Sequence, residues 1–350
     1  MLFIDKDEPS IIQARELHLS RVSCRIRRKL DGTKCNNQQC EICNRVTHKI
    51  KNVSNKIVEI LTDEIFLKTI LVGLPQELFE MCELVWSEMV PGFNWQEYEV
   101  FLKIKNSKNP TQLQNIIINK YLNSHNLLRK IFDYDDWFKN GKDQVRYDAY
   151  QLATNLNRYT CTYCNRSYTH TIKTKDNHKV MRPTFDHWFA HTRHPLLGLS
   201  FYNLIPSCAL CNSSVKGFKE YLISSHLHPY IDKDCCDHIT FDYSLDDETR
   251  KYKINLIPIA GADRAVKSYE DLMIKEIYSS HQSELSDLIR IKDAYSQQYI
   301  SEMMNTYSAA GLTHEEVYRL AFGVELSSAD FHKRPLSKFS KDILSKLKII

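Results

Sequence analysis

Three pairs of cysteines in this sequence have the spacing that places two thiolates on one metal ion. They are Cys40/Cys43, Cys161/Cys164 and Cys208/Cys211. One tight turn can aim both sulfurs of such a pair at a single ion, and two pairs complete a tetrahedral Zn²⁺ site. The total of eleven cysteines is odd, which disfavours a disulfide framework and favours metal binding.

Two of these pairs bracket a segment that carries further reactive side chains. Cys161/Cys164 precede Asp186, His187 and Asn203, and Cys208/Cys211 follow them. A zinc ion held by both pairs would join the start of the segment to its end. Because thiolates would fill all four positions, we expect a structural ion that takes no part in chemistry.

The polar residues of this segment are suited to hydrolysis of a phosphodiester bond. Residues 180–187 predict a strand that ends at Asp186 and His187, and a helix is expected after Ser207, on which Asn212 lies four residues after Cys208. Asn212 would therefore face the end of the strand. A carboxylate and an amide oxygen suit Mg²⁺, a neutral histidine suits a general base, and Asn203 is placed to orient it.

The stretch 161–216 resembles the HNH (ββα-metal) endonucleases. Asp186 and His187 match the family's Asp-His pair, Asn203 its central asparagine and Asn212 its last metal ligand. Many members have histidine at that last position, although the HNH domains of RNA-guided CRISPR nucleases also have asparagine. The resemblance implies DNA cleavage with His187 as general base, Asp186 and Asn212 on a catalytic Mg²⁺ or Mn²⁺, and Asn203 ordering the loop.

The same resemblance makes Lys216 and Arg182 candidate contacts with nucleic acid. The short stretches 195–197, 203–208 and 334–338 resemble the corresponding sequences of bacterial HNH proteins of antiphage defence. Among these, the nuclease subunit of Septu-type systems works beside an ABC-type ATPase. This similarity implies DNA as the substrate, an ATPase as a partner subunit and a role in antiviral defence.

Two other functions compete with the nuclease. A non-catalytic zinc module could bind nucleic acid or a protein through the same fold, but it would not need Asp186, His187 and Asn212 together. A zinc deaminase would need a His-x-Glu sequence beside its cysteine pairs, and none accompanies them. We therefore expect an endonuclease.

The rest of the chain predicts an α+β protein that is mainly helical, with the zinc-stapled nuclease module embedded in it. We expect a basic, cysteine-bearing segment (1–65), a helical region (66–157), the nuclease module (158–222) and a loop-rich, then helical region (223–350). Apolar residues recur with helical spacing over 78–89, which places Cys82 in the core. Thr313 and Glu316 predict a capping box, and 266–308 have a long helical pattern.

The amino-acid composition excludes some classes of protein and favours others. Only nine glycines occur, too dispersed for a dinucleotide fingerprint or a phosphate-binding loop. Residues 21–56 hold ten Lys or Arg against two acids, which favours a polyanionic partner. No apolar run approaches the ~18 residues of a membrane span, and the acidic start differs from a secretory signal. We expect a cytoplasmic protein without membrane contact.

Several other residues could also bind a metal or nucleic acid, but their patterns are weaker. Cys35, Cys40 and Cys43, with Cys24 or His48 as fourth ligand, could form a second zinc site. His191 and His194 could touch the phosphate or the metal, but we expect surface histidines. A His/Cys cluster at 226–238 is expected to be structural, and we expect the aromatic residues near the zinc pairs to pack around the ion rather than stack on bases.

Overall fold

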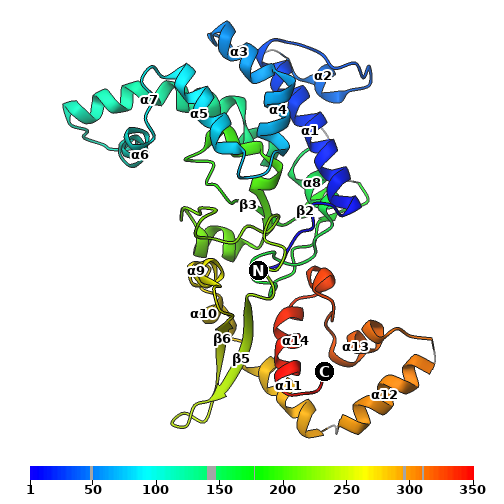
Figure 1. Ribbon diagram of the computed structural model, residues 1–350. Helices are drawn as coiled ribbons and strands as arrows, with labels where there is room; N and C mark the ends of the chain where they lie inside the picture. The colour runs from blue at the N-terminus through cyan, green and yellow to red at the C-terminus, as the bar shows by residue number, and fades with distance from the viewer. Residues whose placement is uncertain (48–49, 140–146, 177, 295–296, 310) are drawn as a thin grey trace. The chain divides into compact units, whose positions relative to one another are not determined.

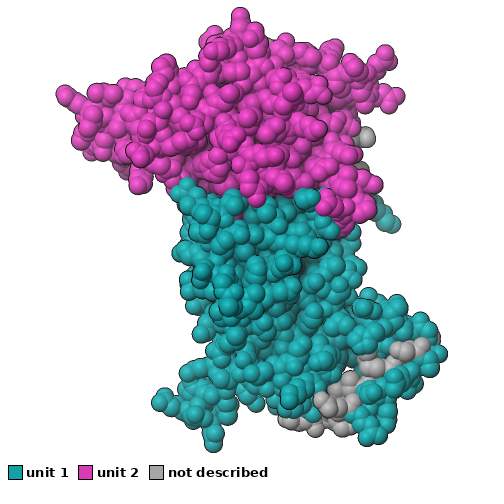
Figure 2. All heavy atoms as spheres, in the orientation of Figure 1, with its two compact units in different colours: residues 1–6, 157–186, 205–350 teal, residues 7–156, 187–204 magenta. Residues whose placement is uncertain are grey.

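The computed structural model describes residues 1–47, 50–139, 147–176, 178–294, 297–309 and 311–350. It is α+β, mainly helical, with small two-stranded sheets (Figure 1). None of the helices in the described ranges is long and apolar enough to cross a membrane. The chain divides into two compact units, coloured separately in Figure 2: unit 1 contains 1–6, 157–186 and 205–350, and unit 2 contains 7–156 and 187–204.

Unit 2 is mainly helical in its described residues. Its α-helices are α1 (Pro9–Leu30), α2 (Glu41–Arg45), α3 (Asn55–Thr62), α4 (Glu64–Val72), α5 (Leu78–Met89), α6 (Trp95–Ile104), α7 (Gln112–Ile131) and α8 (Ala149–Leu156). A π-helical turn, η1 (Tyr134–Lys139), follows α7, and two 3-10 turns, η2 (Pro195–Leu199) and η3 (Phe201–Asn203), belong to the returning segment 187–204.

The helices of unit 2 begin at residues that can satisfy free backbone N–H groups. Ser54, Asp63 and Asn94 accept such bonds at the starts of α3, α4 and α6, and Thr111 forms a capping box at α7. Helix α1 packs against α2, α3, α4 and α8, while α4 and α7 contact η2. The segment 187–204 is therefore held against the helical core of its own unit.

Unit 1 contains the strands and the C-terminal helices. The strands are β1 (Ile172–Lys173), β2 (Lys179–Met181), β3 (Thr184–His187), β4 (Leu204–Ser207), β5 (Ile239–Leu245) and β6 (Tyr252–Pro258), paired as β1–β2, β3–β4 and β5–β6. The helical elements are η4 (Leu210–Lys216, π-helical), α9 (Asp263–Asp271), α10 (Ile274–Ser279), α11 (Gln282–Ala294), α12 (Gln297–Ala309), α13 (His314–Phe322), η5 (Ser328–Lys333, 3-10) and α14 (Ser337–Lys346). The last residue of β3 and the first of β4 are assigned to unit 2.

The longest strand pair anchors the core of unit 1. β5 and β6 are antiparallel, with Ile239 opposite Pro258 and Leu245 opposite Tyr252. Helix α14 packs on β5, and α10 and α11 pack on β6. Phe241 of β5 contacts the rings of Tyr278 and Phe339 at centroid distances of 4.4 and 5.4 Å.

Several sequence-based expectations are confirmed and others need correction. Helix α5 spans 78–89 with Cys82 buried, and Thr313 and Glu316 form the capping box of α13. The strand expected over 180–187 is instead two strands, because Pro183 between β2 and β3 lacks a backbone N–H. The helical pattern over 266–308 is divided into α9 to α12, and Met273, with φ of +49°, separates α9 from α10. The expected nuclease module 158–222 is shared between the two units.

Candidate metal centres and candidate active site

Cys161, Cys164, Cys208 and Cys211 converge in unit 1. Their sulfur atoms all lie within 4.8 Å of one another, and none of the four is in a disulfide. Four thiolates around Zn²⁺ at about 2.3 Å would stand about 3.8 Å apart, so this donor set fits a tetrahedral zinc ion. Burial raises the pKa of the Cys161 thiol well above its ordinary value, and a bound cation would offset that cost of forming a thiolate.

Backbone contacts shape each half of this cluster and link one half to the other. The N–H of Arg166 points to the sulfur of Cys164 at 3.4 Å, and the N–H of Cys211 points to that of Cys208 at 3.5 Å. The N–H of Thr162, beside the first pair, donates to the carbonyl of Pro206 in β4 at 3.2 Å. The start and the end of the segment are thus joined as the sequence predicts.

A second set of four cysteines converges in unit 2. The sulfur of Cys24 lies 3.7 Å from that of Cys40 and 3.2 Å from that of Cys43, and Cys43 lies 3.5 Å from Cys35. These separations are far above the ~2.05 Å of a disulfide and near those of a tetrahedral thiolate site. Cys24 is therefore the fourth member of the set. His48, the other candidate, lies outside the described residues.

Asp186 is buried in unit 1 and has two strong partners. Its carboxylate accepts a hydrogen bond from the Tyr163 hydroxyl at 2.5 Å and pairs with the Lys216 ammonium at 3.1 and 3.2 Å. Burial raises the pKa of Asp186, and the Lys216 charge opposes that rise. Tyr163 is fully buried, which confirms a packing role for this tyrosine.

The neighbouring candidates in unit 1 are placed differently from one another. Asn212 lies one helical turn after Cys208, with its N–H donating to the Cys208 carbonyl at 3.1 Å, and its side-chain amide points to the Phe185 carbonyl of β3 at 3.5 Å. Lys216 is only 1% exposed, so a phosphate contact by Lys216 would require its ion pair with Asp186 to open. Arg182 is half-buried and donates to the Pro183 carbonyl at 2.6 Å.

Within the described part of unit 2, His187 makes a hydrogen bond to the backbone and contacts two neighbouring rings. Its Nε2 lies 2.9 Å from the Gly198 carbonyl oxygen. Because a carbonyl can only accept, Nε2 carries a proton, and in the neutral ring Nδ1 is then the basic nitrogen. The His187 ring contacts Tyr134 at 4.4 Å and His191 at 4.2 Å between centroids. This arrangement suits a general base that acts through Nδ1.

Asn203 orders the loop that holds His187. Its side-chain oxygen accepts from the N–H of Phe189 at 2.7 Å, and its amide donates to the carbonyls of Phe189 and Leu197, both at 3.0 Å. Leu197 precedes Gly198, whose carbonyl binds His187. Gly198 itself approaches the backbone closely, since a Cβ there would stand 3.1 Å from the Phe132 carbonyl oxygen.

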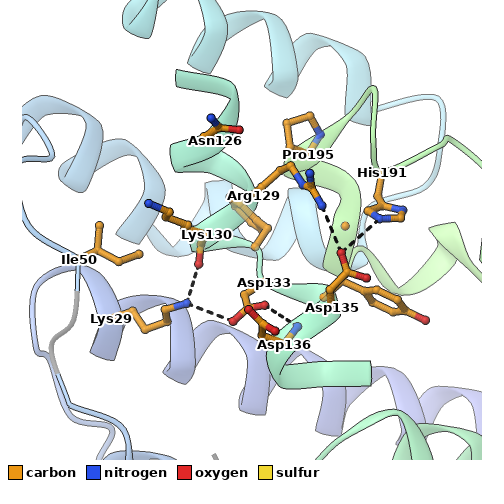
Figure 3. A pocket seen from close by; sticks show the side chains of 13 residues that line it. Lys29, Ile50, Asn126, Arg129, Lys130, Asp133, Asp135, Asp136, His191 and Pro195 are labelled. Carbon is orange, nitrogen blue, oxygen red and sulfur yellow. Dashed lines mark hydrogen bonds and ion pairs between the residues drawn. The ribbon is translucent and has the colours of Figure 1, made fainter. Parts of the chain in front are cut away.

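A pocket of about 470 Å³ lies within unit 2, next to the residues that contact His187 (Figure 3). Tyr134, His191 and Gly198 are among its lining residues. Asp135 pairs with Arg129 at 3.3 Å and lies 3.7 Å from Nε2 of His191. Burial lowers the pKa of His191. His191 is thus a pocket residue rather than the expected surface histidine.

His194 also differs from the expected surface position. Its ring is buried among Phe79, Trp95 and Phe189. Burial lowers its pKa to about 4, which keeps the ring neutral at physiological pH. Its apolar surroundings give it a packing role.

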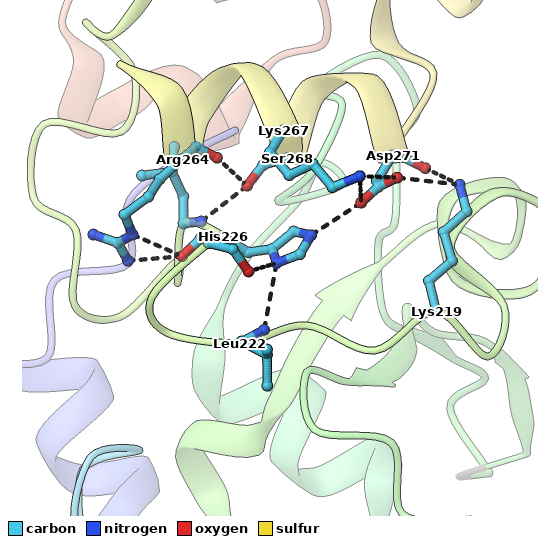
Figure 4. Close-up of polar contacts among 9 residues, drawn as sticks. Lys219, Leu222, His226, Arg264, Lys267, Ser268 and Asp271 are labelled. Carbon is cyan, nitrogen blue, oxygen red and sulfur yellow. Dashed lines mark hydrogen bonds and ion pairs between the residues drawn. The ribbon is translucent and has the colours of Figure 1, made fainter. Parts of the chain in front are cut away.

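The remaining His/Cys cluster does not converge on a metal position among the described residues. Instead, His226 lies 2.9 Å from Asp271 through Nε2, and its Nδ1 is 2.9 Å from the Ser225 hydroxyl (Figure 4). The thiols of Cys235 and Cys236 donate to the Met1 carbonyl. These contacts tie loops of unit 1 to α9 and to the first residues of the chain, which agrees with the structural role expected.

The sequence alone does not reveal Tyr134, Asp135 and Gly198 as parts of the site. Tyr134 and Asp135 lie about fifty residues before His187 and belong to no motif, and Gly198 acts through its carbonyl. No family model, curated protein or solved structure matches this chain. The chemistry of the site therefore has to be argued from its own residues.

Proposed function

We propose that this protein is a metal-dependent HNH endonuclease that hydrolyses DNA phosphodiester bonds. The observation that carries the proposal is the hydrogen bond from Nε2–H of His187 to the Gly198 carbonyl, which makes Nδ1 the basic nitrogen of the neutral ring. Asn203, which orders that loop, and Asp186, which precedes His187 in β3, are the residue types that the reaction requires.

The chain's own residues account for the base and its support. His187 would take a proton from the attacking water at Nδ1, and the Gly198 carbonyl would stabilise the imidazolium that forms. Asn203 holds the Leu197–Gly198 backbone in place and thereby sets the direction of the ring. The first cysteine cluster would hold Zn²⁺ as a structural ion.

Asp186 and Asn212 provide the oxygen ligands that suit a catalytic Mg²⁺ or Mn²⁺. When bound, such an ion would stabilise charge on the phosphate and on the leaving oxygen. The Lys216 ammonium now supplies the positive charge beside Asp186. Because like charges repel, Lys216 must leave the carboxylate when a divalent ion binds there.

A supercoiled-plasmid assay with Mg²⁺ or Mn²⁺ tests this function. We expect nicking by the wild-type protein, loss of nicking in His187→Ala and Asp186→Asn, and wild-type nicking in His178→Ala, which changes an exposed histidine of the β1–β2 connection. DNA binding without cleavage, alone and with an ABC-type ATPase added, would instead favour the non-catalytic zinc module.

A further inference from the structure

The segment 31–47 of unit 2 has little apolar surface to hold it in place. Apart from the cysteines, Ile42 and Val46 are the buried residues of this segment, and residues 33–39 are all exposed. Helix α2 has only five residues, too few for a stable isolated helix. Some other interaction must therefore hold this segment in its folded conformation.

The second cysteine cluster links this segment to helix α1. Cys35, Cys40 and Cys43 come from the segment itself, and Cys24 comes from the buried face of α1. The N–H of Cys35 points to the sulfur of Cys43 at 3.1 Å. Figure 1 shows α2 beside α1, which the helix contacts also record.

We propose that these four cysteines hold a second Zn²⁺ ion and that this ion folds residues 31–47 onto α1. The sulfur separations of 3.2, 3.5 and 3.7 Å suit one tetrahedral ion. Four thiolates and Zn²⁺ carry a net charge of −2, and the Arg21 guanidinium points to the Cys40 sulfur at 3.8 Å. The surrounding basic sequence thus compensates the charge of the complex.

The two zinc sites differ in access to solvent. In the second cluster Cys35 is exposed, whereas in the first cluster three thiols are buried and Cys208 is half-buried. A chelator can attack the ion at an exposed ligand, so the second site releases zinc faster than the first.

Zinc content and release of the full-length protein test the proposal, independently of nuclease activity. We expect two zinc ions per wild-type chain, released to a chromogenic chelator in two phases that differ at least tenfold in rate. Cys40→Ser should keep one ion and lose the fast phase, and Cys82→Ala, which changes a buried cysteine outside both clusters, should keep both ions and both phases.

Amide hydrogen exchange locates the effect. In Cys40→Ser, exchange should rise at least tenfold across 35–46 and stay unchanged in β5 and β6 of unit 1. One zinc ion per wild-type chain that Cys40→Ser retains would overturn the proposal. Unchanged protection of 35–46 in a Cys40→Ser protein that has lost one ion would overturn the folding role.

Discussion

Replacement of Asn203 by alanine tests the structural basis of the proposed base. The side chain is fully buried and makes three hydrogen bonds to the backbone of its own loop. The Leu197 carbonyl would keep a bond from the N–H of Ser200 at 3.2 Å, but the N–H and carbonyl of Phe189 would lose the bonds that Asn203 makes.

The expected loss of stability follows from the N–H and the carbonyl of Phe189. Leaving a buried polar group without its partner costs about 1–3 kcal/mol, so the two Phe189 groups together give about 4 kcal/mol. In a domain of this size, 1 kcal/mol corresponds to about 2–4 °C in the melting temperature. We therefore expect Asn203→Ala to lower the melting temperature of unit 2 by about 8–16 °C.

Differential scanning calorimetry measures this shift, with Asn106→Ala, an exposed asparagine of the same unit, as the matched control. The control should melt within about 2 °C of the wild type. Plasmid nicking by Asn203→Ala, assayed well below its own melting temperature, should also fall, because the Gly198 carbonyl loses its support. A melting temperature equal to that of the wild type would refute the role given to Asn203.

Three further outcomes are expected. Lys216→Met should lower the free energy of unfolding by about 3–5 kcal/mol at pH 7, since it leaves the buried Asp186 charge unpaired. Because burial raises the pKa of Asp186, this deficit should shrink as the pH falls, and urea titrations of Lys216→Met and of Lys216→Met/Asp186→Leu should show the double variant recovering most of the loss. Among the histidines of unit 2 whose pKa burial lowers below the ordinary 6.5, the pKa falls to about 4 for His18, about 3 for His125 and about 4 for His194; stability should therefore be full above pH 6.5 and fall below it, by at most about 4 kcal/mol per pH unit for these three together, and melting temperatures independent of pH between 7 and 5 would contradict this. Cys211→Ser should lose the slowly released zinc and lower the melting temperature of unit 1, and a variant that keeps this ion would remove Cys211 from the ligand set.

The cysteine clusters could be predicted from the sequence, but the surroundings of the reactive side chains could not. Cys-x-x-Cys spacing encodes a local turn, so the convergence of Cys161/Cys164 with Cys208/Cys211 follows from a few residues. The ion pair of Asp186 with Lys216 depends instead on how η4 packs, because its π-helical turn changes the side-chain directions expected from an α-helix. Such contacts depend on tertiary packing, and local sequence patterns do not predict them.

Asn203 and the π-helical turn η1 show the same contrast. The position of Asn203 in the motif predicted a loop-ordering residue, and its three hydrogen bonds join that loop. The contact of Tyr134 with His187 joins residues more than fifty positions apart, through a helical region whose sequence indicates only burial. The pocket beside His191 could therefore be found only in the folded chain.

Chemical rescue tests the central claim most directly. In His187→Gly, the lost ring leaves space beside the Gly198 carbonyl, and added imidazole can supply the missing base. We predict that the variant keeps its zinc, melts at a lower temperature because the buried ring and its hydrogen bond are lost, does not nick supercoiled plasmid with Mg²⁺ below that temperature, and recovers nicking in proportion to imidazole concentration. A His187→Gly protein that nicks plasmid at the wild-type rate without imidazole would contradict His187 as the general base.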